Sequence, residues 1–194
     1  MDLLRGGRSL LLTTCLLLLS PGVALQRAAA QVLPFESYTV KDGLLSNDIR
    51  VITQDADGYL WIGTRDGVSR FDGRQFVNYT TADGLPSGSI GEIVEDRTAD
   101  KKSFWILGSR GVLLRWSPGH SEPVKYDSTL PWMHRITTIC QDHAGTLWAG
   151  TEDTLVQIVG DTIRAVSAGI STRYPDIIKE QGDSVLWITS RSGD

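Results

Sequence analysis

The chain is poor in the residues that build disulfide frameworks, metal clusters and nucleic-acid surfaces. Its 194 residues include 2 cysteines and 3 histidines. Lysine and arginine number 19 against 23 acidic residues, and no stretch gathers the cations into a basic patch. The formal net charge is −4. This balance argues against a nucleic-acid-binding surface on the chain.

Helical periodicity and long apolar runs are also scarce. After residue 34, no stretch repeats apolar residues with a period of about 3.6 over any length. The apolar run at residues 10–19 follows a positively charged start, is ended by a Pro-Gly pair, and is shorter than the ~20 residues of a membrane span. We expect residues 1–30 to be a secretory signal peptide, cleaved after Ala30 or after Ala24. An uncleaved anchor is the alternative.

Removal of the signal peptide would leave Cys140 as the single cysteine of the mature chain, where it cannot form an internal disulfide. Cys140 ends the apolar stretch 136–140, at the place that Thr53 holds in the first repeat. We interpret it as a small strand residue. A nucleophilic role would need an activating base, and nothing in the sequence orients the nearby His134 or His143.

A tryptophan returns four times in a similar context. The sequence Asp-Ala-Asp-Gly-Tyr-Leu-Trp-Ile-Gly-Thr contains Trp61, Asp-His-Ala-Gly-Thr-Leu-Trp-Ala-Gly-Thr contains Trp148, and looser copies surround Trp105 and Trp187. The steps are 44 (105−61), 43 (148−105) and 39 (187−148) residues. A four-stranded propeller blade needs roughly this period. We therefore predict an all-β fold, a β-propeller of four-stranded antiparallel blades with about three and a half blades present.

Each repeat unit divides into four expected strands separated by glycine turns. The units lie at approximately residues 43–80, 84–127, 130–166 and 170–194. The last unit stops after its second strand. Since propellers typically close with 4–8 blades, we expect residues 31–194 to be the N-terminal part of a propeller in a longer protein.

The repeated residues are assigned structural roles. The tryptophans should fill the contacts between blades, because each buries a large apolar surface of about 150–250 Å². The assigned residues are Trp61, Trp105, Trp148, Trp187, Gly58, Gly63, Gly145 and Gly150.

The run Gly-Leu-x-Ser-Asn, followed by Gln-Asp-x-x-Gly-x-Leu-Trp-Ile-Gly-Thr and Gly-Val-x-Arg-Phe-Asp-Gly, resembles the two component regulator propeller repeat. Residues 43–73 carry nearly all of this pattern, residues 136–151 a good part, and the other two units are degenerate. The resemblance implies a periplasmic sensor region. It also implies a parent protein anchored in the inner membrane, with a histidine kinase or a diguanylate cyclase as its output. The sequence holds no second apolar span, phosphoacceptor helix or nucleotide-binding glycine box, so the output is implied by analogy alone.

The implied function is sensing of an extracellular ligand, a glycan or a small molecule, without chemistry in this segment. The implied partners are the remaining blades and the output domain, and a homodimer stays open. We expect no cofactor, metal or catalytic residue. The alternatives are a secreted propeller that binds or scaffolds, and a propeller enzyme that acts on polysaccharide.

Several polar clusters could carry chemistry. The run Asp55-Ala56-Asp57-Gly58 could start a calcium loop, but the further acidic positions and the distal glutamate are absent. We interpret it as a turn whose side chains bond their own backbone. Glu92, Glu95 and Asp96 could serve acid–base catalysis, yet the last two fall at the turn of the repeat.

The histidines and two further aromatic residues complete the candidates. His120, His134 and His143 are 14 (134−120) and 9 (143−134) residues apart, without a metal-ligand pattern, and we expect solvated loops. Trp116 and Trp132 depart from the repeat. An aromatic side chain on a loop between blades could stack on a sugar or a peptide, so Trp132 is the candidate ligand contact, with a structural role as its alternative.

Overall fold

The computed structural model describes residues 35–124, 135–152, 154–160, 162–166, 175–182 and 185–190. The predicted signal peptide, Trp132 and His134 lie outside the described residues. Every described strand belongs to the compact unit Ser37–Asp194. No described helix is long and apolar enough to cross a membrane.

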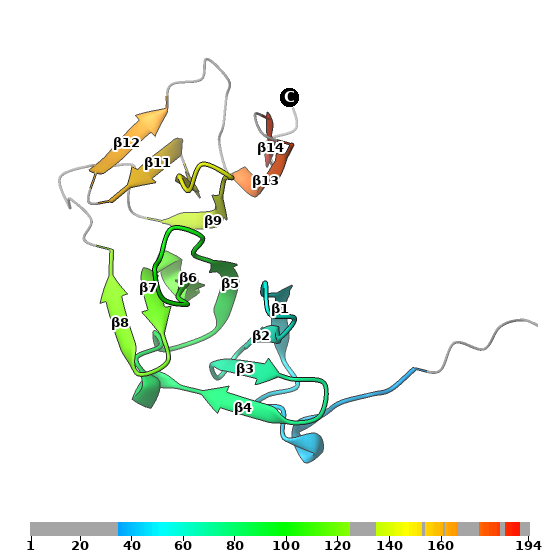
Figure 1. Cartoon of the computed structure of the whole chain (residues 1–194). Coiled ribbons are helices and arrows are strands. Elements are labelled where there is room, and N and C mark those ends of the chain that lie inside the picture. Colours follow the sequence, from blue (N-terminus) through cyan, green and yellow to red (C-terminus); the bar gives the residue numbers. More distant parts are fainter. Residues whose placement is uncertain are drawn as a thin grey trace, which may run out of the picture. The chain divides into compact units, whose positions relative to one another are not determined.

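The predicted all-β fold is confirmed. Three four-stranded antiparallel sheets and one two-stranded sheet follow one another along the chain, each with its strands paired in sequence order (Figure 1). Sheet 1 contains β1 (Ile49–Gln54), β2 (Leu60–Thr64), β3 (Val68–Phe71) and β4 (Phe76–Tyr79). Sheet 2 contains β5 (Ile90–Glu95), β6 (Phe104–Gly108), β7 (Leu113–Ser117) and β8 (His120–Pro123). Sheet 3 contains β9 (Ile136–Gln141), β10 (Leu147–Thr151), β11 (Leu155–Val159) and β12 (Thr162–Val166). Sheet 4 contains β13 (Pro175–Gln181) and β14 (Val185–Ser190).

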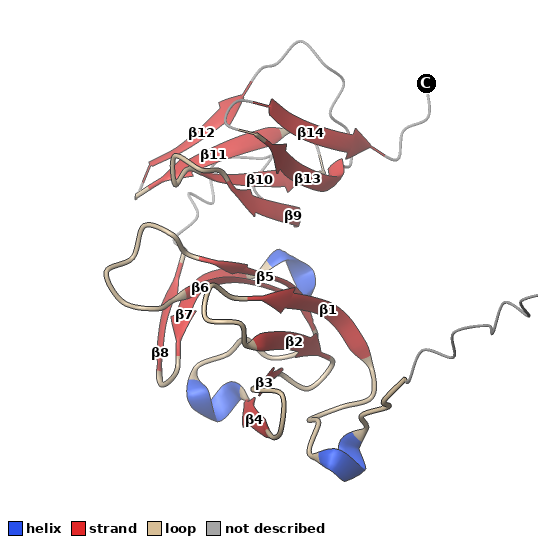
Figure 2. Ribbon diagram, turned by 45° about the vertical axis from the view of Figure 1, so that its right-hand side comes forward, coloured by secondary structure: helices blue, strands red, loops and turns tan. Residues whose placement is uncertain are grey.

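The helices of the described chain are short 3₁₀ turns, one before β1 and two in connections between strands (Figure 2). They are η1 (Val40–Asp42), η2 (Thr81–Asp83) and η3 (Ser109–Gly111). The first two begin with a threonine whose side chain accepts a backbone N–H, while the aspartate three residues later accepts the threonine N–H. This capping box, followed by a glycine with positive φ, precedes the first strand of both sheet 1 and sheet 2.

The first strand of every sheet shifts register at the same place, one residue after its start. Such bulges bend a strand and increase its twist. The register beyond the bulge defines equivalent positions in the four sheets. The residues opposite the four repeat tryptophans are Thr53, Val94, Cys140 and Lys179.

The core lies between consecutive sheets. Trp61 of β2 is 2% exposed and packs on sheet 2, with its ring centroid 4.3 Å from that of Phe104 and 6.0 Å from that of Trp116. Ile90 and Ile93 of β5 belong to the same buried cluster. A second cluster joins sheets 2 and 3 in the same manner. The first strands of sheets 2 and 3 are therefore buried against the preceding sheet.

The packing role predicted for the tryptophans stays a prediction at Trp187. Its side chain is 61% exposed, whereas Trp61 is buried and Trp105 and Trp148 are partly buried. The physical reason is that a tryptophan of this repeat is covered by the sheet that follows it. Among the described residues, no sheet follows β14.

The glycines of the repeat serve two purposes. Gly58 and Gly145 have φ values of 89° and 85° in the turns that precede β2 and β10. Gly63 instead lies where sheets 1 and 2 approach closely. A Cβ atom at Gly63 would lie 2.6 Å from Val51 Cγ1 and 3.0 Å from Ile90 Cγ2.

Candidate functional site

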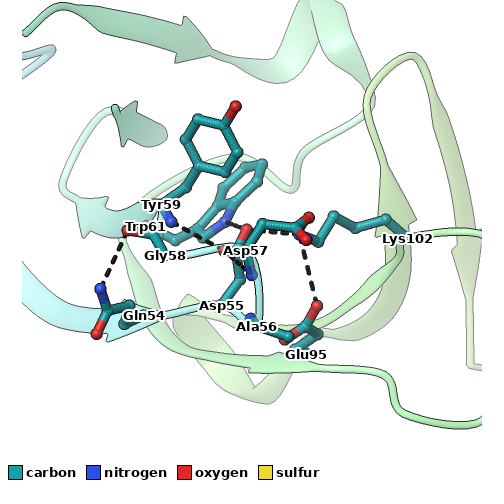
Figure 3. Close-up of polar contacts among 9 residues, drawn as sticks. All are labelled: Gln54, Asp55, Ala56, Asp57, Gly58, Tyr59, Trp61, Glu95 and Lys102. Carbon is teal, nitrogen blue, oxygen red and sulfur yellow. Dashed lines mark hydrogen bonds and ion pairs between the residues drawn. The ribbon is translucent and has the colours of Figure 1, made fainter. Parts of the chain in front are cut away.

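The turn that follows β1 is the most densely bonded polar site of the described chain (Figure 3). Asp55 is 6% exposed, and its Oδ1 accepts the N–H groups of Asp57 at 3.0 Å and Tyr59 at 2.9 Å. Its Oδ2 accepts Trp61 Nε1 at 2.7 Å and Lys102 Nζ at 2.8 Å. Burial by itself would raise the pKa of Asp55, but these hydrogen bonds outweigh it and lower the pKa.

Lys102 gathers three carboxylates around its ammonium group. Its Nζ contacts Asp55, Asp57 and, at 3.7 Å, Glu95 Oε1 (Figure 3). Burial by itself would lower the pKa of Lys102, but the hydrogen bonds that its ammonium group donates to the two aspartates raise the pKa. An ammonium group thus lies where a calcium ion would have to bind. In the described part of the chain, no group of three or more His, Cys, Asp and Glu side chains could hold a metal ion.

The same turn recurs with changes in the other sheets. In sheet 3, Asp142 Oδ1 accepts the Thr146 N–H and its Oδ2 accepts Trp148 Nε1 at 2.8 Å. In sheet 4, Gln181 takes the place of the aspartate and accepts Trp187 Nε1. The aspartate side chain, or its glutamine substitute, therefore orients the repeat tryptophan in three of the four sheets.

Sheet 2 departs from this arrangement. Asp96 is 5% exposed and its Oδ2 lies 2.7 Å from Arg115 Nε of β7. Its Oδ1 accepts Thr98 and the Nε2 of Gln141. Trp105 Nε1 is buried and has no hydrogen-bond partner among the described residues. The polar insertion after Asp96 thus coincides with replacement of the Asp–Trp bond by an Asp–Arg ion pair.

In sheets 2, 3 and 4, a polar side chain near the end of the first strand contacts the turn that follows the first strand of the preceding sheet. Glu95 accepts the Ala56 N–H at 2.9 Å, and Gln141 accepts the Arg97 N–H at 2.8 Å. Glu180 accepts the His143 N–H at 2.9 Å. The donors occupy equivalent positions in their turns, and so do the acceptors. We call this repeated contact the inter-sheet clasp.

Glu92 is the carboxylate most altered by burial. Its Oε2 accepts the Ile139 N–H of sheet 3 at 2.6 Å. Burial raises the pKa of Glu92 from 4.5 to about 6, and the hydrogen bonds from Ile139 and Thr138 only partly oppose this effect. The structure does not bring Glu92 into one catalytic pair with Glu95 and Asp96, because these two belong to separate turn contacts.

The remaining candidates are dispersed. His120 Nε2 lies 3.0 Å from Glu122 Oε1, and His143 Nδ1 lies 2.6 Å from Glu180 Oε1. Cys140 lies in β9 opposite Trp148, where burial raises the pKa of its thiol. Trp116 is 1% exposed within the core, so it has no surface for stacking a ligand.

Sequence reasoning missed the inter-sheet clasp and the role of Lys102. Glu95, Gln141 and Glu180 share only a polar side chain directly before the turn aspartate or, in sheet 4, before Gln181. That signal could have been found by aligning the four repeats. Lys102 lies in an insertion that has no counterpart in the other units, so no repeat comparison could have identified it.

Comparison with known proteins shows what two segments of the chain resemble. Residues 43–66 and 129–153 match the family described as two component regulator propeller. A histidine kinase P4 of Formosa agariphila is 49% identical over 45 residues, which are 23% of this chain and 3% of that protein. The predicted relationship to this repeat family is confirmed.

Solved structures show the same fold. One is the extracellular domain of a protein described as a hybrid two component system of B. thetaiotaomicron, with a TM-score of 0.60, 22% identity, and coverage of 79% of this chain and 22% of that chain. Another is the extracellular domain of a protein described as a one component system of the same organism. It gives a TM-score of 0.62 at 19% identity, covering 80% of this chain and 22% of that one. At these identities the likeness concerns the fold alone, and the chain spans about a fifth of each solved chain.

Proposed function

Because the chain carries two component regulator propeller repeats, we propose that it is an extracytoplasmic sensor segment of a membrane signalling protein. The observation that carries this proposal is the match of two separate segments to that family. The likeness to extracellular domains of two component systems supports a location outside the cytoplasm. In this proposal, residues 1–30 direct export, the sheets receive the signal, and a histidine kinase or a diguanylate cyclase elsewhere in the parent protein provides the output.

The turn contacts support a role without catalysis. Asp55, Asp96 and Asp142 are the recurrent acids of the repeat, and each one holds backbone N–H groups, a tryptophan or a cation. A carboxylate whose lone pairs are occupied in this way is poorly placed to transfer protons. Glu92 is the observation that favours the polysaccharide-acting alternative, because a raised pKa suits a general acid. Its bond to the Ile139 N–H gives it a structural use instead.

A cavity of about 490 Å³ between sheets 2 and 3 is the proposed place of ligand binding. Its size is within the usual ~300–1,000 Å³ of small-molecule sites. Glu92, Arg110, Arg135 and Glu152 line it together with several hydroxyl groups. This lining suits a polar, hydroxylated small molecule such as a sugar.

Arg110 is the cation of this cavity that forms no ion pair with another described residue. Arg135 is paired with Glu152 at 3.0 Å, whereas Arg110 has no ion pair among the described residues. Arg110 also has a φ of 64°, the only positive value at a non-glycine residue in the described chain. Such a backbone costs about 1–3 kcal/mol and is found most often at binding and active sites.

Two experiments test the proposal. Alkaline phosphatase joined to the C-terminal end of the chain should be active in cells, and deletion of residues 1–30 should abolish that activity. For binding, thermal melting of the chain should be followed with a panel of neutral and acidic oligosaccharides. A melting shift that is lost in Arg110→Ala and kept in the surface control Arg50→Ala supports sensing at this cavity. Turnover of the same oligosaccharides by the chain would contradict the proposal and support the enzyme alternative.

A further inference from the structure

Four aromatic side chains fill the junction between sheets 1 and 2. Trp61 of β2 packs against Tyr79 of β4, with ring centroids 5.9 Å apart, and against Phe104 of β6 at 4.3 Å. Trp116 of β7 completes the group, with its ring centroid 5.1 Å from that of Tyr79. Trp61, Phe104 and Trp116 are at most 2% exposed. Large rings therefore occupy the space between these two sheets.

The junction between sheets 2 and 3 keeps the tryptophan and replaces the other three rings by aliphatic side chains. The residues at the four equivalent positions, in the same order, are Trp105, Val124, Leu147 and Ile158. The pairing of Leu147 with Ile158 across β10 and β11 repeats that of the two core aromatics across β6 and β7. The Val124 N–H donates to Leu113 O at 3.1 Å, which gives Val124 the place that Tyr79 holds beside β3.

A cavity of about 560 Å³ lies at these smaller side chains. Its apolar lining consists of Trp105, Pro123, Val124, Leu147, Ile158 and Ile163, and thus includes all four equivalent positions. We call it the Trp105 cavity. Its volume is within the ~300–1,000 Å³ of small-molecule sites, which are also mostly apolar with a few polar groups. A ring supplied by a ligand would meet here the surroundings that the aromatic side chains meet at the preceding junction.

Two hydrogen-bond donors belong to the lining of the Trp105 cavity. Trp105 Nε1 is buried without a partner among the described residues, whereas Trp61 Nε1 donates to Asp55. Burying a donor without an acceptor is unfavourable, so an acceptor brought by a ligand would remove this cost. Arg115 Nε lies 2.7 Å from Asp96 Oδ2, and the Arg115 side chain is 35% exposed. Its two Nη groups donate to no described residue.

The charges of the lining favour a ligand that is neutral. Asp96 already balances Arg115, and Glu122, the other charged residue of the lining, is exposed and lies 3.0 Å from His120. An anion would be repelled by two carboxylates, and a cation would have to be placed beside the guanidinium group. A carbonyl oxygen accepts hydrogen bonds from both donors and adds no charge.

We propose that the Trp105 cavity binds a neutral aromatic small molecule that carries a carbonyl oxygen. The ring packs on Trp105 among the aliphatic side chains, and the oxygen accepts hydrogen bonds from Trp105 Nε1 and from the Arg115 guanidinium group. This cavity shares no lining residue with the cavity of about 490 Å³. The inference does not depend on the proposed sensing role.

Titration with acetophenone, followed by nitrogen–proton correlation NMR, tests the proposal. The chain has 6 tryptophans, each with its own indole N–H signal, and the signal that is lost in Trp105→Phe belongs to Trp105. Acetophenone up to about 10 mM should move this signal downfield, because the N–H gains an acceptor, and the shift should saturate. Benzoate, benzylamine and cyclohexyl methyl ketone should each bind at least about tenfold more weakly, because they change the charge or remove the aromatic ring.

Restoring an aromatic side chain provides the second arm. Val124→Tyr introduces the residue that sheet 1 has at this position, and it should weaken acetophenone binding by at least about tenfold because the new ring occupies the cavity. Val159→Tyr, at a position 59% exposed and outside the lining, is the matched control and should bind normally. Thermal melting shows whether the variants fold, and Leu147→Phe replaces Val124→Tyr if that variant does not.

Three results would overturn the proposal. One is a Trp105 signal that does not move with acetophenone, which would mean that the chain itself occupies the cavity. Another is an equal shift of every tryptophan signal, which would indicate unspecific contact. The third is binding to the cavity-filling variant as tight as to Val159→Tyr, or tighter binding of benzoate or benzylamine than of acetophenone.

Discussion

Glu180 of β13 accepts both the backbone N–H and the imidazole Nδ1 of His143, at 2.9 Å and 2.6 Å. One carboxylate therefore joins sheet 4 to the turn between β9 and β10. Glu95 and Gln141 make the backbone part of this contact at the two earlier junctions. At each of the three junctions, the sheets of this protein are thus joined by apolar burial and by this recurring hydrogen bond.

Replacement of Trp61 should strongly destabilise the fold. Trp61→Ala removes a fully buried indole that contacts Phe104 and donates to Asp55, and we expect a loss of about 3–5 kcal/mol in the free energy of unfolding. Chemical denaturation monitored by circular dichroism measures it. Trp187→Ala, at a 61% exposed position, is the control, with an expected change within about 0.5 kcal/mol in dilute solution. Equal losses in the two variants would contradict the packing argument.

Removal of Lys102 should destabilise the turn of sheet 1. Lys102→Met keeps the alkyl chain but leaves the buried Asp55 without its cation, and we expect a loss of about 1.5–3 kcal/mol. Lys101→Met is the neighbouring control with an exposed side chain.

The stability that the Asp55–Lys102 contact contributes should decrease as the pH falls. The pKa of Asp55 is lowered in the folded state, so its contribution is present above the unfolded value of 3.8 and is lost as the pH falls through the folded value. Urea denaturation between pH 7 and pH 3 should therefore show a shallower acid loss in Lys102→Met than in the unmodified chain. Parallel curves would show that Lys102 does not hold the Asp55 carboxylate ionised.

Glu92 should give stability the opposite dependence on pH. Its pKa is raised from 4.5 to about 6 in the folded state, so the fold binds this proton more tightly than the unfolded chain does. The stabilisation is fully present below pH 4.5 and is lost as the pH rises through about 6. The difference amounts to about 2 kcal/mol. Glu92→Gln should flatten stability between these pH values and be the more stable protein at pH 7.5, as measured by urea denaturation. If Glu92→Gln keeps the pH dependence of the unmodified chain, other groups cause the change of the free energy of unfolding with pH.

A methyl group at Gly63 should separate sheets 1 and 2. Gly63→Ala places a Cβ 2.6 Å from Val51 Cγ1 and 3.1 Å from the Ile90 carbonyl oxygen, so we expect a loss of about 1–3 kcal/mol from overpacking. Gly91→Ala is the matched control, because its added Cβ meets only the Leu107 oxygen at 3.5 Å. The melting temperatures of the two variants are compared. An equally large decrease for Gly91→Ala would point to loss of backbone freedom instead of crowding.

The tryptophan period allowed the fold class to be predicted, because each copy marks the second strand of one sheet. The four strands of sheet 1 lie within the first predicted unit, residues 43–80, and are separated by turns as expected. The Asp55 turn was also readable, since an aspartate followed by glycine three residues later commonly bonds its own backbone. These features are local, and short-range sterics and hydrogen bonds decide them.

Contacts between sheets could not be predicted from the sequence in the same way. Lys102 reaches Asp55 from an insertion 47 residues away, and Glu92 meets the Ile139 N–H from the same separation. Such contacts depend on how one sheet is placed against the next. The exposure of Trp187 has the same origin, since the repeat specifies the residue but not the sheet that covers it.

The sequence by itself determined the repeat and the strand order within each sheet, because these follow from periodicity and from turn chemistry in adjacent residues. It also carried the resemblance to a repeat family. Only the tertiary structure decided which carboxylates are structural, which one has a pKa raised to about 6, and which apolar faces are open. The physical reason is that burial and pairing are properties of the neighbours in space. Ile52 and Ile93 have the same side chain at equivalent positions, and only the presence of a covering sheet makes one buried and leaves the other exposed.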